Sequence, residues 1–115
     1  METKTILESA DKLASQLIAS EIKRDYPEQL FRYLIEQKAM ANEQKAIQNI
    51  ETLMKKMPNS GFEKRGKSYV ARFTQTRKIL SAFKVEQPLL QLPLNDLLQI
   101  LGWTVRLMRF KEGGQ

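Results

Sequence analysis

The spacing of apolar residues is the feature that most restricts how this 115-residue chain can fold. Near the N-terminus, apolar residues recur at intervals of three and four, as in Ile6, Ala10, Leu13 and Leu17. This is the period of an amphipathic α-helix. No segment alternates apolar and polar residues over a strand's length, and no internal repeat is visible. We therefore predict an all-α fold, a compact bundle of four to five helices that forms one domain over residues 1–115.

The first two helices are predicted from their start and stop signals. Thr5, with Glu8 three residues later, has the spacing of a capping box, and the first helix should end near residue 24. Pro27 suits the first turn of the second helix, where its missing N–H has no partner to lose. The second helix either runs to Met57 or breaks near residues 40–42, and the sequence leaves both possibilities open.

A turn and a connecting segment separate the remaining helices. Residues 58–67 form a basic loop, after which Ser68 should cap a third helix that extends to about residue 83. We expect residues 85–93 to be an extended linker, because a proline disfavours helix at the residue before it. The fourth helix should begin near Asn95 and end at residues 113–114. A glycine within it, Gly102, indicates a close helix–helix approach.

Composition excludes several kinds of site. The chain has no cysteine and no histidine, so it lacks disulfides, thiolate ligands, imidazole ligands and the commonest general base. We accordingly expect no enzyme activity, no cofactor and no metal site. No stretch approaches the roughly 18 apolar residues that span a bilayer. Charged residues interrupt the first ten positions, which argues against a signal peptide, so we expect a cytoplasmic protein without membrane partners.

The positive charge is concentrated in one part of the chain. The net charge is +6, but residues 55–84 alone hold nine Lys/Arg and one Asp/Glu. Such a local excess is typical of a surface that meets a polyanion. The alternative is a solvated face without function. Eight basic residues are the predicted nucleic-acid-binding set: Lys55, Lys56, Lys64, Arg65, Lys67, Arg72, Arg77 and Lys78.

Two hydroxyl residues of the third helix, Thr74 and Thr76, would extend this surface. Lysine, arginine and threonine side chains contact phosphates without reading bases, so we expect binding that depends strongly on salt and little on sequence. The ten-residue turn at 58–67 is too long for a helix-turn-helix motif, which argues against sequence-specific DNA binding.

Two further motifs have competing interpretations. Residues 61–68 match the G-x-x-x-x-G-K-[ST] pattern of a nucleotide-binding P-loop. The preceding residues are helically spaced, whereas a P-loop follows a strand, so nucleotide binding is the weaker alternative. Arg106 follows Trp103 by three residues and could stack on it or on a base. Since tryptophan is usually largely buried, we predict that this pair marks a boundary between core and solvent.

The segments Thr74–Leu80 and Leu97–Leu107, together with the short, basic, helical character of the chain, resemble the small subunits of multi-subunit CRISPR surveillance complexes of the Cascade and Csm types. The second segment is similar to the C-terminal helical region of type I-D large subunits. The resemblance implies a non-catalytic subunit, packed in several copies beside other subunits. It would stabilise the duplex of guide RNA and target strand, and the displaced strand, through backbone contacts.

The resemblance also implies that leucines at positions 89, 90 and 92 pack against neighbouring copies. A different class of function stays open. A helical protein–protein adaptor would use its basic face to meet an acidic partner, and it would lose binding when an apolar groove is altered.

Overall fold

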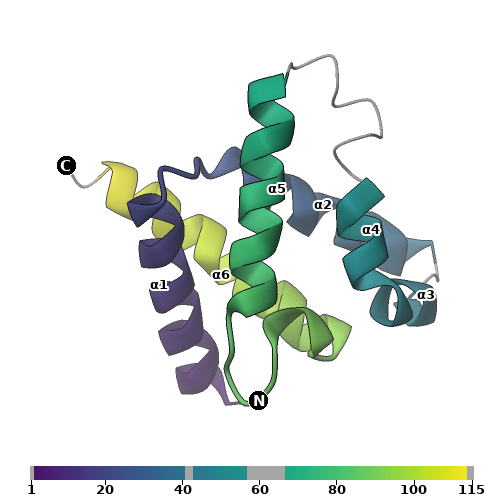
Figure 1. Ribbon diagram of the computed structural model, residues 1–115. Helices are drawn as coiled ribbons and strands as arrows, with labels where there is room; N and C mark the ends of the chain where they lie inside the picture. Colours follow the sequence, from purple (N-terminus) through teal and green to yellow (C-terminus); the bar gives the residue numbers. More distant parts are fainter. Residues whose placement is uncertain (1, 41–42, 57–66, 114–115) are drawn as a thin grey trace.

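The computed structural model describes residues 2–40, 43–56 and 67–113 (Figure 1). The helices are α1 (Thr3–Ala19), α2 (Asp25–Ala39), α3 (Glu43–Gln48), α4 (Ile50–Lys56), α5 (Lys67–Ala82), the short 3-10 helix η3 (Leu89–Gln91) and α6 (Leu94–Gly113). Within these ranges the β pairing is an isolated bridge between Lys84 and Pro88. The predicted all-α bundle is confirmed. Its radius of gyration, 13.5 Å, matches the roughly 13 Å expected of a compact chain of this length.

Helix α6 brings α1, α2 and α3 together. It packs against α1 on one side and against α2 and α3 on the other. Helix α5 lies across the bundle, with α1 to its left and α4 to its right in Figure 1, and contacts α2, α4 and η3. The two short helices, α3 and α4, sit beyond the end of α2. Segments far apart in sequence therefore share one core.

The predicted apolar face of the first helix forms a large part of that core. Ile6, Ala10, Leu13 and Leu17 are buried, as the three- and four-residue spacing indicated. Ile6, Leu13 and Leu17 belong to one continuous cluster with buried leucines of α2 and α6. Burial of a leucine side chain contributes on the order of 2 kcal/mol. Packing of these faces, more than intrinsic helix propensity, accounts for the helices.

The end of α1 differs from the prediction. The helix starts at Thr3, so Thr5 is not its N-cap, and it ends at Ala19, five residues earlier than expected. The Ile22 N–H donates to the Leu17 carbonyl at 2.9 Å, and the Glu21 N–H donates to the Ile18 carbonyl at 3.0 Å. These two bonds form a Schellman motif. Ile22 reaches the core from the turn and is not part of the helix.

The second predicted helix breaks. Helix α2 ends at Ala39, close to the break that was left open, and Asn49 interrupts the following helical stretch between α3 and α4. Pro27 lies in the first turn of α2, as predicted. Ile50 and Met54, on α4, are buried in the main core.

The segment before α6 corrects a second prediction. Residues 85–93 are not an extended linker, because they contain η3 and a tight turn in which the Leu89 N–H donates to the Phe83 carbonyl at 2.8 Å. Leu89, Leu90 and Leu92 are buried in the chain's own core, so no neighbouring copy is needed to cover them. The prolines prevent helix only at the residues next to them. Burial of the leucines determines the conformation of the rest of the segment.

Candidate functional site

Several basic residues of the predicted set lie on two neighbouring helices, α4 and α5. Phe73 and Leu80 point into the core, and Lys78, on the opposite face of α5, is exposed. Lys55 is exposed on α4, which packs beside α5. Arg77 is half-buried. We call the exposed surface of these two neighbouring helices the α4–α5 face.

Some residues of the predicted set lie outside the description. Lys64 and Arg65 fall within 57–66, outside the described residues. Lys56 ends α4 and Lys67 begins α5, but only their backbone positions are described. Ser68 lies inside α5, one residue after its start, so it is not the predicted N-cap.

Helix α4 bears on the P-loop pattern. The residues that precede the match, Ile50–Lys56, are helical. The described residues therefore contain no strand leading into the loop, and a P-loop needs such a strand to deliver its backbone beneath the phosphates.

Arg72 is partly committed to contacts within the protein. Its Nη2 atom lies 3.9 Å from a carboxylate oxygen of Glu21, in the turn after α1. Its Nη1 atom donates to the Gln75 side chain at 3.5 Å. Burial raises the pKa of Tyr26 above its ordinary value, and the positive charge of Arg72 opposes that rise. Arg72 thus faces the α1–α2 turn, and Lys78 and Lys55 are the better candidates for contacts with an external anion.

The threonine hydroxyls of α5 are not available to a ligand in the way the sequence suggested. Thr76 is fully buried, and its hydroxyl donates to the Arg72 carbonyl at 2.9 Å. The Thr74 hydroxyl donates in the same way to the Val70 carbonyl at 2.9 Å. Such bonds to the preceding helical turn satisfy a hydroxyl inside a helix. The predicted extension of the phosphate surface through these two residues is therefore wrong.

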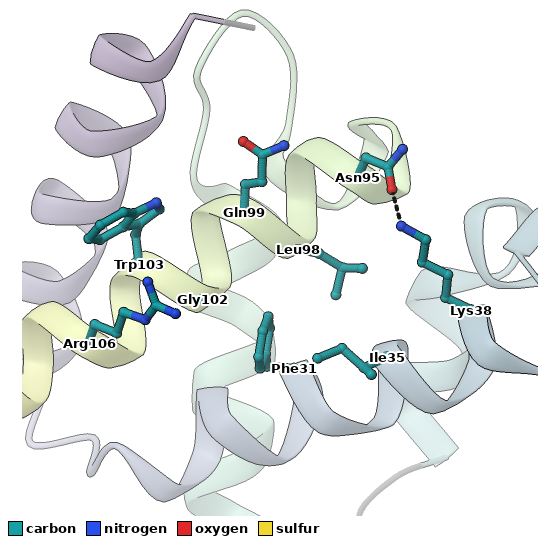
Figure 2. Close-up of a pocket in the computed structure, with 9 residues that line it drawn as sticks. All are labelled: Phe31, Ile35, Lys38, Asn95, Leu98, Gln99, Gly102, Trp103 and Arg106. Carbon is teal, nitrogen blue, oxygen red and sulfur yellow. Dashed lines mark hydrogen bonds between the residues drawn. The ribbon is translucent and has the colours of Figure 1, made fainter.

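A second feature, a groove of about 700 Å³ between α2 and α6, was not predicted from the sequence (Figure 2). Phe31 and Ile35 of α2 and Leu98 of α6 form its apolar floor. A Cβ atom at Gly102 would lie 3.2 Å from the Phe31 ring, so the glycine lets α2 approach α6 as predicted. Ile35 is 44% exposed, which leaves apolar surface open in the groove.

Polar side chains lie at the two ends of this groove. At one end the Lys38 ammonium donates to the Asn95 side-chain oxygen at 2.6 Å. At the other end the Arg106 guanidinium lies 5.1 Å from the centre of the Trp103 ring, a cation–π contact. Trp103 is 37% exposed and therefore contributes to the surface. The predicted core–solvent boundary places this residue correctly but misses the groove that it lines.

Sequence signals for the groove exist but are weak. On α2, Phe31, Ile35 and Lys38 recur at helical spacing, as do Gln99, Trp103 and Arg106 on α6. Each of these rows of residues, taken alone, looks like the border between the buried and the exposed side of a helix. Only the pairing of α2 with α6 makes a groove.

The remaining observations concern the part of the chain that the structure describes. No three Asp/Glu side chains there are grouped so that they could hold a metal ion. None of its helices has both the length and the apolar character to cross a bilayer. Comparison with protein-family profiles, curated proteins and solved structures finds no match to this chain.

Proposed function

We propose that this protein is a non-catalytic binder of nucleic-acid backbones and that the α4–α5 face is its binding surface. The observation that carries the proposal is the charge of α5. This 16-residue helix holds four basic residues and no acidic one. Its exposed side includes Lys78, and the neighbouring α4 adds Lys55. A surface of this kind attracts a polyanion over a distance set by the salt concentration.

The residue types on this face favour phosphates over base edges. Lysine ammonium groups are point charges that neutralise phosphates without sequence information. Arg72, whose guanidinium could read a base edge, is engaged with Glu21 and Gln75 instead. Binding should therefore tolerate scrambled sequences and weaken steeply as salt rises.

The resemblance to CRISPR surveillance complexes gives the proposal a specific form. In that form, several copies bind beside the guide RNA and target strand and stabilise the duplex and the displaced strand. Three further basic residues of the predicted set, Lys64, Arg65 and Lys67, would add phosphate contacts. Stability of the chain does not depend on such neighbours, because its own core covers the leucines of residues 89–92.

The test is a salt titration of binding to a labelled RNA–DNA duplex and to single strands, by fluorescence anisotropy. We compare wild type with Lys55→Gln/Lys78→Gln. Each lost phosphate contact should reduce the slope of log K against log salt by roughly 0.7–0.9. The matched control is Lys4→Gln/Lys12→Gln, which removes two exposed charges from α1.

Three outcomes are informative. A weaker, less salt-dependent interaction in the first variant alone supports the α4–α5 face. An equal effect of both variants would show that binding depends on the net charge of the protein and not on the α4–α5 face. If wild type does not bind at low salt, the nucleic-acid proposal is wrong and the adaptor alternative takes its place.

A further inference from the structure

We propose that the α2–α6 groove is a docking site for an acidic amphipathic helix of a partner protein. This inference is independent of nucleic-acid binding, because it concerns a different surface. The groove has the form such a partner needs, since it lies between two helices and presents apolar side chains along its floor. The exposed portions of Ile35 and Trp103 are the apolar surface that the partner would cover.

Charge identifies the partner as acidic. The nine residues that line the groove include two cations, Lys38 and Arg106, and no carboxylate. In the described structure, Lys38 is hydrogen-bonded to a neutral amide, and Arg106 lies over an aromatic ring. Neither has a carboxylate oxygen of a described residue within 4.0 Å.

Two other cations of the same two helices do pair with carboxylates. Arg32 lies 2.8 Å from Glu28, and Lys111 lies 3.0 Å from Asp11. The groove lining holds two cations and no carboxylate, which favours a partner that supplies the negative charges.

The distance between the two cations determines how far apart the acidic residues of the partner helix should lie. On α6, Asn95 and Arg106 mark the two ends, and eleven residues of helix span about 16 Å. A docked helix with Asp or Glu about eleven residues apart would reach both cations. Apolar residues between them, at helical spacing, would cover the floor over Phe31 and Leu98.

A nucleobase fits the groove less well than a helix does. A base stacks on an open aromatic face, and the guanidinium of Arg106 already lies over the Trp103 ring. Aliphatic side chains of Ile35 and Leu98 form much of the remaining floor, and these do not stack. The test therefore treats nucleic acid as a competing occupant.

The test uses two helical peptides of about 16 residues, which are about 24 Å long. Both carry leucines at i, i+4 and i+7. One has glutamates toward both ends, and the other has lysines at the same positions. We expect saturable binding of the glutamate peptide to the full chain by anisotropy, at least about ten-fold tighter than that of the lysine peptide.

Charge reversal makes the test specific. Lys38→Glu/Arg106→Glu should reverse the preference and bind the lysine peptide more tightly. Both side chains are exposed, so the variant should fold, and circular dichroism checks this. Arg109→Glu is the matched control on α6, exposed but outside the groove, and should keep the wild-type preference. The Lys55→Gln/Lys78→Gln variant should also bind the glutamate peptide normally, which separates this proposal from the one above.

Four results would overturn the inference. They are no saturable binding of either peptide, equal binding of both, displacement of the glutamate peptide by an oligothymidine strand, and a groove-dependent dimer in sedimentation. The last two would assign the groove to nucleic acid or to a second copy of this chain.

Discussion

Glu21 has a backbone conformation that glycine adopts readily and other residues rarely adopt. Its φ angle is 60°, in the left-handed region, at the position after the C-cap of α1. The two Schellman hydrogen bonds hold this geometry. Burial of Ile22 in the same core cluster as Leu17 stabilises it further. No sequence rule marks a glutamate as a helix stop, which explains why the predicted end of this helix was five residues late.

Replacement of Glu21 tests whether its positive φ angle costs stability. We expect Glu21→Gly to have a free energy of unfolding about 1 kcal/mol higher than Glu21→Ala, because only glycine adopts this φ without steric conflict. Both variants lose the exposed contact with Arg72, so that loss cancels in the comparison. Urea denaturation followed by circular dichroism measures the difference. Equal stability of the two variants would show that the turn is not strained.

At the scale of elements, helices with one regular face were predictable and irregular connections were not. Periodicity located α1 and its core residues, because this helix buries a stripe at helical spacing, and cap and turn residues located α5 and α6 to within two residues of their starts. It missed buried Thr76, since a hydroxyl bonded to the preceding turn can enter a core. It also missed the α2–α6 groove, which exists only through tertiary pairing. Lys78, a member of the predicted binding set, is exposed because it lies on the face of α5 opposite the buried Phe73 and Leu80.

The connection before α6 gives an element-scale prediction. Leu90 is 2% exposed in η3, so Leu90→Ala should lower the free energy of unfolding by about 2–5 kcal/mol. Gln91→Ala, at the exposed neighbouring position, should change it by less than about 0.5 kcal/mol. Chemical denaturation of both variants provides the comparison. Similar values would mean that the free protein does not bury these leucines in solution.

For the molecule as a whole, the excess of positive charge should lower the stability of the fold and favour the binding of polyanions. The net charge is +6, and the ion pairs of the described residues are at least partly exposed, where each contributes less than about 1 kcal/mol. Repulsion among the basic residues of 55–84 should therefore outweigh these attractions at low ionic strength.

Sodium chloride should accordingly raise the melting temperature of the free protein while weakening its interaction with nucleic acid. The rise should be smaller in Lys55→Gln/Lys78→Gln, where part of the repulsion is already removed. Thermal unfolding at increasing salt, followed by circular dichroism, measures both effects. A melting temperature that falls with salt would show that attractive pairs dominate instead.

The packing of α1 against α6 also has a consequence for synthesis. Residues 3–19 emerge from the ribosome before residues 94–113, which carry the surface that covers their apolar face. At the usual rate of translation, roughly 5–20 residues per second, α1 waits about 5–20 s for its partner. During that interval its leucines are open to chaperones and to other nascent chains. The α1–α6 packing is therefore completed only when α6 arrives.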